Sequence, residues 1–228
     1  GLYNSQNPLQ PKTEFSLQLT DVGVRALYEK FVTVQEFVPF AKYLQGSMAL
    51  KLKLATDLDG SLKPVWNTFL SDGGLNVATL KLDDFKPFNA LADALKVDAL
   101  KNPTLSKFSA FYEIKDGRFF LKPFKTKLAG IDASIEGSNG LDRSIDYTVN
   151  LILPAEKLTG AAFDALGSLG GVNLSALKPK TIPVTVHITG TLDNPIIQPS
   201  LQGAQNVGQQ VLDAAQEEAK RRAEEEIQ

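Results

Sequence analysis

The stretch FYEIKDGRFFLKPFKTKLAGIDASIEGSNGLDRSIDYTVNLIL, residues 111–153, decides the fold class of this chain. Apolar and polar residues alternate through most of it, and the turn residues Asp116–Gly117 and Ser138–Gly140 interrupt the alternation. A period of two is typical of a strand with one buried and one solvated face, and Asp-Gly pairs favour hairpin turns. The stretch therefore predicts several antiparallel strands whose apolar side chains share one face of a sheet.

The apolar positions form rows that we expect on the inner face of this sheet. The first strand and its return contribute Phe108, Ala110, Tyr112, Ile114, Phe120 and Phe124. The next strand contributes Ile131, Ala133 and Ile135. The longest row consists of Ile145, Tyr147, Val149, Leu151 and Leu153. The alternate positions are mostly polar, and we expect them to face water.

The same alternation continues the sheet on both sides of this stretch. Further strands are predicted for residues 13–20, 47–60, 73–84 and 182–190. A slip in the apolar phase between Val77 and Leu80 indicates a β-bulge in the third of these segments. In the last segment, the alternation places His187 on the polar face.

Two segments have the apolar period of a helix. The first covers residues 22–44, with Asp21 as its expected N-cap and Pro39 as the place where it kinks or ends. The second covers residues 87–97 and carries a proline at its first turn. These elements predict an α+β fold: a strongly twisted, mostly antiparallel, curved sheet that forms an open half-barrel or groove around one or two helices.

Composition changes divide the chain into three parts. Residues 1–12 are polar and contain prolines, so we expect a flexible lead-in. Residues 13–200 hold the α+β domain. Residues 201–228 are charged and rich in alanine, with Glu217 and Arg221 at a favourable helical spacing, and predict a solvated tail helix.

Composition also excludes several functions. The formal net charge of -2 provides no electrostatic basis for binding nucleic acid. The chain has no cysteine, which excludes disulfides, thiolate metal sites and a cysteine nucleophile. It contains no run of about 18 apolar residues that would predict a membrane span. Because the chain begins with Gly1 rather than Met, we expect it to be a fragment, with any anchoring segment outside it.

The sequence contains no pattern that predicts a catalytic or metal-binding residue or a cofactor site. His187 is the sole histidine, and a surface role suits its polar position better than a catalytic one. LGSLG at 166–170 lacks the first glycine of a nucleophile elbow, and DLDGS at 57–61 lacks the later ligands of a calcium loop. Trp66 suits core packing better than a ligand platform. We therefore predict a protein that is not an enzyme.

The order of motifs resembles the C-terminal region of bacterial AsmA-like proteins. The similarity rests on a strand after Gly46, a strand that ends with Ile114-Lys115-Asp116-Gly117, and a long strand with Asp146, Tyr147, Leu151 and Leu153. The terminal Gly190-Thr191 and Pro195 also match the family pattern, so the resemblance covers about residues 13–200.

The resemblance implies a module outside the cytoplasm and no catalytic residue. AsmA-like proteins are anchored in the inner membrane by an N-terminal helix, extend into the periplasm, and act in outer-membrane biogenesis and envelope lipid homeostasis. They are related to bridge-like proteins whose curved sheets hold phospholipid acyl chains. The implied partners are phospholipid, other envelope proteins and the membrane, and no lipid-contacting residue can be transferred from the family.

These considerations lead to two hypotheses for the apolar face. It can line a lipid-binding groove through the rows Ile131, Ala133, Ile135 and Ile145, Tyr147, Val149, Leu151, Leu153. The same rows suit a closed core equally well, in which case the domain is a structural scaffold or a protein-interaction module of the cell envelope.

Overall fold

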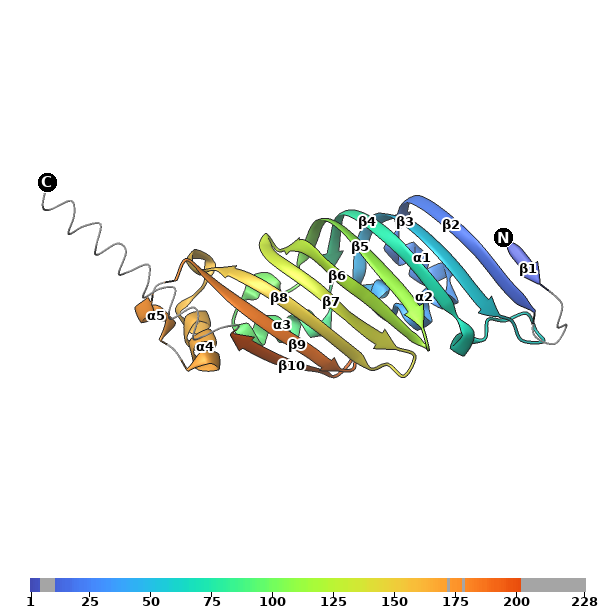
Figure 1. Ribbon diagram of the computed structural model, residues 1–228. Coiled ribbons are helices and arrows are strands. Elements are labelled where there is room, and N and C mark those ends of the chain that lie inside the picture. Colours follow the sequence, from blue (N-terminus) through green and yellow to red (C-terminus); the bar gives the residue numbers. More distant parts are fainter. Residues whose placement is uncertain (5–10, 172, 178, 202–228) are drawn as a thin grey trace, which may run out of the picture.

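The computed structural model describes residues 1–4, 11–171, 173–177 and 179–201. It consists of one ten-stranded sheet in which every strand pairs antiparallel with its neighbour in sequence, in the order β1 to β10. The sheet is open, with β1 and β10 at opposite ends (Figure 1). The helices α1, α2 and α3 lie on one of its faces (Figure 1). The fold is thus an α+β fold built on a curved antiparallel sheet.

The strands of the sheet are mostly ten or more residues long. Their bounds are β1 Leu2–Asn4, β2 Lys12–Gly23, β3 Leu44–Asp57, β4 Leu70–Leu82, β5 Thr104–Lys115, β6 Arg118–Leu128, β7 Ile131–Gly140, β8 Ile145–Pro154, β9 Thr181–Gly190 and β10 Pro195–Leu201.

The helices are short by comparison and lie in four connections between strands. Their bounds are α1 Val24–Lys30, α2 Val32–Phe37, η1 Pro39–Tyr43, η2 Trp66–Thr68, α3 Lys86–Leu95, η3 Asp98–Leu100, η4 Ala155–Lys157, α4 Gly160–Gly170 and α5 Leu174–Leu177, where η denotes a 3-10 helix.

The inner face of the sheet has the residues that the alternation predicts for its later strands. In β8, Ile145, Val149, Leu151 and Leu153 are buried. Opposite them, β9 buries Val184, Val186 and Ile188, while His187 faces outward and is exposed. Helix α3 packs onto this face through Phe88, Leu91, Ala92 and Leu95, which belong to the same apolar core. The alternating pattern of residues 131–153 thus leads directly to a one-faced core.

Three register shifts bend the sheet, since a bulge adds a residue to one strand and increases its local twist. One lies between β3 and β4, where the pairs Gly46–Leu80 and Met48–Val77 leave an extra residue in β4. This confirms the bulge predicted between Val77 and Leu80. Another lies between β2 and β3 at Leu19–Val22, and the third lies between β6 and β7.

The third bulge changes which residues of β6 face inward from those that the alternation predicts. The register shift falls between Leu121 and Phe124, so the residues on either side of it point to the same face. Phe119 is buried and Phe120 is half-exposed, with the Lys115 ammonium 5.6 Å from its ring centre. The prediction that Phe120 faces inward is therefore wrong, and that for Phe124 is confirmed.

The helix predicted over 22–44 is broken into α1, α2 and η1. The chain takes extended backbone angles at Phe31, between α1 and α2, and Val38 separates α2 from η1 immediately before Pro39. Valine and phenylalanine have weak helix propensity, and proline removes a backbone donor. Asp21 is not the N-cap: it lies in β2 and accepts a hydrogen bond from Ser47 Oγ at 2.6 Å, and Gly23 precedes the helix instead.

Both ends of the described chain add strands that the sequence pattern did not indicate. Within the expected lead-in, β1 pairs with residues Lys12–Glu14 of β2. After the predicted last strand, β10 pairs with β9, and its two prolines are compatible with an edge strand. The charged helix predicted for 201–228 lies outside the described residues, apart from Leu201.

Adjacent residues of β8 provide a matched test of the one-faced core. Leu151 is 1% exposed, whereas Ile152 is 50% exposed on the opposite face. Leu151→Ala should lower the free energy of unfolding by about 2–5 kcal/mol, because it leaves a cavity in the core. Ile152→Ala should lower it by less than about 1 kcal/mol. Urea titrations followed by circular dichroism measure both, and equal losses would contradict the assignment of faces.

Candidate apolar ligand cavity

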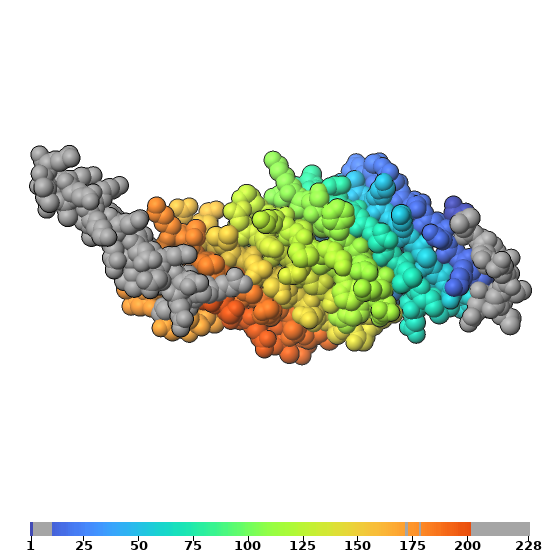
Figure 2. Space-filling view, viewed as in Figure 1, coloured from blue at the N-terminus to red at the C-terminus, as the bar shows by residue number. Residues whose placement is uncertain are grey.

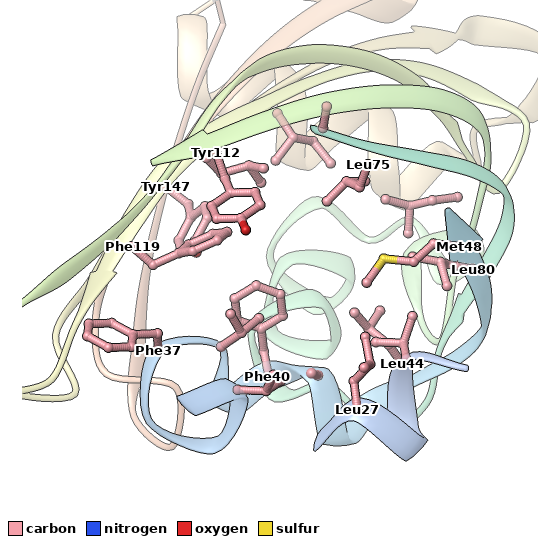
Figure 3. A pocket seen from close by; sticks show the side chains of 18 of the residues that line it. Leu27, Phe37, Phe40, Leu44, Met48, Leu75, Leu80, Tyr112, Phe119 and Tyr147 are labelled. Carbon is pink, nitrogen blue, oxygen red and sulfur yellow. The ribbon is translucent and has the colours of Figure 1, made fainter. Parts of the chain in front are cut away.

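A cavity of about 260 Å³ lies between the inner face of the sheet and the helices of residues 24–43. One buried water needs only about 10–15 Å³ of such space. Figure 3 shows side chains from the sheet and from the helices pointing into the same interior space. The helical segment lies on one side of that space, and the strands arch over the other.

The lining comes from elements that are far apart in the sequence. The strands contribute mainly Met48, Leu50, Leu52, Leu54, Leu75, Leu80, Phe108, Ala110, Tyr112, Ile114, Phe119, Leu121, Phe124, Ile135, Ile145, Tyr147, Val149 and Ile188. The helical side contributes Val24, Leu27, Thr33, Val34, Phe37, Val38, Phe40 and Ala41, and α3 contributes Phe88. None of the described lining residues carries a charge. The cavity therefore suits an uncharged, apolar ligand.

Three of the hydroxyl groups that line the cavity, those of Ser71, Tyr112 and Tyr147, are hydrogen-bonded to protein. Tyr112 Oη lies 3.3 Å from Ser71 Oγ, which itself donates to the carbonyl oxygen of Lys53 at 2.8 Å. Tyr147 Oη donates to Asn139 Oδ1 at 2.8 Å. Burial raises the pKa of both tyrosines above the ordinary value, most strongly for Tyr147. Both hydroxyls thus stay neutral at physiological pH, and the cavity remains uncharged.

A buried side-chain amide connects the sheet to the helical side of the cavity. Asn139 in β7 is 1% exposed, and its Nδ2 donates to the carbonyl oxygen of Phe37 at 2.8 Å. Phe37 is the last residue of α2, where helix carbonyls lack partners within the helix. Asn139 therefore satisfies a carbonyl that would otherwise be buried without a hydrogen bond.

Aromatic rings close one end of the cavity. The ring of Phe37 stacks on that of Phe69 with 5.0 Å between ring centres, and its edge meets Trp66 at 6.0 Å. Tyr112 stacks on Phe119 at 5.5 Å. Trp66 thus packs among other aromatic rings, as the sequence predicts.

Apolar surface continues from the cavity toward the β2 end of the sheet. Leu50, Leu52 and Leu54 line the cavity but are only half-buried. Their partners across the sheet, Phe15 opposite Leu54 and Leu17 opposite Leu52, are 39% and 37% exposed. Figure 2 shows the face of the sheet that points away from the helices, which is not deeply hollowed. On the inner face, Phe15 and Leu17 pair with the cavity-lining Leu54 and Leu52, so the cavity is continuous with exposed apolar side chains there.

The predicted lipid-contacting residues divide into two groups. Ile135, Ile145, Tyr147 and Val149 line the cavity. Ile131, Ala133, Leu151 and Leu153 are buried in the core and are not among its lining residues.

The largest contribution that the prediction missed comes from the helical segment, above all Phe37 and Phe40. The apolar stripe of residues 22–44 could have indicated it, because a helix on the inner face must turn that stripe toward the sheet.

Other candidate sites have ordinary surroundings. His187 is exposed on the outer face, with Nδ1 3.2 Å from Thr148 Oγ1. No group of three or more His, Cys, Asp or Glu side chains in the described part of the chain could hold a metal ion. Among the described residues, no helix has the length and apolar character needed to cross a membrane.

Comparisons of the chain with protein-family models, with curated proteins and with solved structures find no match. The cavity is therefore the feature of this protein that bears most directly on its function.

The neutrality of the cavity can be tested by alkaline titration. An unfolded tyrosine has a pKa of about 10, and burial raises that of Tyr147 well above this. The stability that Tyr147 contributes is therefore fully present below pH 10 and is lost as the pH rises further. Of the five tyrosines in the sequence, Tyr147 should give its tyrosinate absorbance only on unfolding. Tyr147→Phe should lower the late absorbance rise by one tyrosinate, and reversible ionisation of Tyr147 near pH 10 in folded protein would contradict its burial.

Proposed function

We propose that this protein is a non-enzymatic lipid-binding module whose cavity shields the acyl chain of a phospholipid from water. The observation that supports this most is the uncharged cavity, which is continuous with the exposed apolar side chains of Phe15 and Leu17. A closed scaffold core would have its interior filled to the density of an organic crystal. A cavity of about 260 Å³ departs from that density in the way a binding site does.

The lining determines which part of an amphiphile can enter. Each buried methylene group gains about 0.8 kcal/mol, so an acyl chain gains steadily as it moves into the cavity. A phosphate or ammonium group would lose its hydration without meeting an opposite charge among the described lining residues, at a cost of several kcal/mol. The acyl chain should therefore bind tail-first, with the head group left in water near the exposed side chains of Phe15 and Leu17.

The resemblance to AsmA-like proteins suggests where such binding would act. We propose that the chain is a periplasmic module of an inner-membrane-anchored protein and supports phospholipid transfer to, or assembly of, the outer membrane. In this role the curved sheet is an open half-barrel around α1, α2 and α3, with polar residues toward water and apolar residues toward the lipid. The four predicted residues at the cavity, Ile135, Ile145, Tyr147 and Val149, would contact the acyl chain.

A second candidate is a protein-interaction module of the cell envelope. Strand β2 pairs with β1 only at Lys12–Glu14, so among the described strands its remaining length has a partner on one side only. Such an edge can accept a strand from another protein. Occupation of this edge would leave the cavity free, so the two candidates predict different ligands.

Binding of a fluorescent fatty acid separates these candidates. The protein should bind cis-parinaric acid and raise its emission, and native mass spectrometry of protein purified from bacterial membranes should show phospholipid adducts. Leu50→Trp, which places an indole in the cavity, should weaken binding about tenfold or more, because it occupies space that the chain needs.

The matched control is Lys51→Trp, which adds the same group to the exposed outer face of β3. It should bind cis-parinaric acid like the unmodified protein. A protein that takes up neither cis-parinaric acid nor phospholipid, or two variants that lose binding equally, would count against the cavity as the lipid site.

A further inference from the structure

We propose that residues 24–43, called the lid from here on, open as a unit to admit the ligand, and that Asn139 latches them shut. The lid contains α1, α2 and η1 and forms the side of the cavity opposite the arched strands (Figure 3). This inference rests on the proposed function in one respect only: the ligand admitted is the acyl chain. The lid's own motion can be measured without any ligand.

The lid leaves and rejoins the sheet at one place. It connects β2 to β3, which are neighbouring antiparallel strands, and Gly23 before it pairs with Ser47 after it. Gly46, near its second end, has a φ of +133°, a conformation that favours glycine. Because both ends meet at one edge of the inner face, the lid can swing away without breaking the pairing of other strands. Few backbone angles would need to change, as is usual for hinged segments.

The lid is also built to be less stable than the sheet. Its three helices have seven, six and five residues, and none has a side-chain hydrogen bond at its N-cap. Helices this short depend on packing rather than on their own hydrogen bonds. The side chains of Leu27 and Val34 line the cavity, so part of their surface borders that space and not other side chains. Low local packing is typical of segments that open separately from the rest of a protein.

The contacts of α2 with the sheet and its loops centre on Phe37. Helix α2 packs mainly against α1 and η1, within the lid. Beyond the lid, the ring of Phe37 packs on Phe69 and Trp66, and its carbonyl oxygen accepts the hydrogen bond from Asn139. Asn139 is itself held by Tyr147 Oη, so its amide cannot turn freely. The hydrogen bond between Asn139 and Phe37 thus joins the middle of the lid to a strand 102 residues away in sequence.

A different hydrogen bond holds the root of the lid. The backbone N–H of Asp83 donates to the carbonyl oxygen of Tyr43, the last residue of η1, at 2.8 Å. Loss of the Asn139 bond would leave this contact in place. Opening should therefore begin at α2 and Phe37 and leave the end near Tyr43 attached.

Hydrogen exchange of single amides tests the motion directly. In the unmodified full chain, the amides of Val38 and Ala41, which are hydrogen-bonded within the lid, should exchange through a local opening. That opening should depend less on urea than the exchange of Val149 and Val186 in the core strands. Asn139→Ala should speed exchange at Val38 about tenfold, the size of effect expected for one buried hydrogen bond.

Thr185→Val is the matched control. It removes another buried side-chain hydrogen bond, from Thr185 Oγ1 to Asn150 Oδ1 at 2.6 Å, between two strands away from the lid. It should leave exchange at Val38 and Ala41 unchanged. If lid and core amides share one opening in the unmodified protein, or if both variants speed the lid equally, the lid does not move separately and the proposal is wrong.

Stopped-flow uptake of cis-parinaric acid tests whether the lid is the entrance. Asn139→Ala should raise the rates of uptake and release together, about tenfold each, so that Kd changes much less than either rate. Faster lid exchange with unchanged uptake would show that the ligand enters elsewhere and would overturn the gate. If cis-parinaric acid does not bind at all, the proposed function fails, and the exchange experiment still decides whether the lid opens.

Discussion

The whole structure depends on one constraint: a long antiparallel sheet with one apolar face must cover that face, and the chain provides few helices to do so. At the β7–β9 end, α3 and the sheet bury their apolar residues against one another, and the core is closed around Leu95, Leu151 and Leu153. At the β2–β4 end, the cover consists of three short helices, and the cavity lies between them and the strands. The cavity lies where the cover changes from tight to loose, so it follows from the ratio of strand to helix rather than from a special set of residues.

Curvature determines how large the uncovered space becomes. Bulges between β2 and β3, β3 and β4, and β6 and β7 bend the sheet toward its apolar face. Close approach of strands also requires glycine: a Cβ at Gly137 would lie 2.4 Å from the carbonyl oxygen of Asp146 and from the ring of Tyr147. Gly137 therefore lets Tyr147 lie against the inner face and reach Asn139. Backbone features in the strands thus position the polar contact that holds α2.

Sequence alone predicted the parts that depend on local alternation, and it missed the parts that depend on distant contacts. The faces of Ile145, Val149 and Leu151 and the bulge after Val77 follow from period-two patterning and were predicted correctly. The inward position of Phe119 was missed, because the bulge after Leu121 reverses which alternate residues of β6 face inward. No pattern in the neighbouring sequence indicates this bulge. Half of the residues in the predicted lipid rows border the cavity and half fill the core, and the alternation is the same in both halves, so it could not separate them. The bond from Asn139 to Phe37 joins residues 102 positions apart, beyond any spacing rule.

The cavity links stability to binding, because the same missing contacts govern both. Larger side chains from the lid would fill the space and strengthen packing, but they would also exclude a ligand. An acyl chain would supply the missing dispersion contacts and so stabilise the lid against the strands, as any ligand stabilises the state that it binds. The hydrogen bond from Asn139 to Phe37 holds the lid whether or not a ligand is bound. The closed lid should therefore be more stable with a ligand in the cavity than without one. In this arrangement the ligand fills the space that the helices leave empty beside the core.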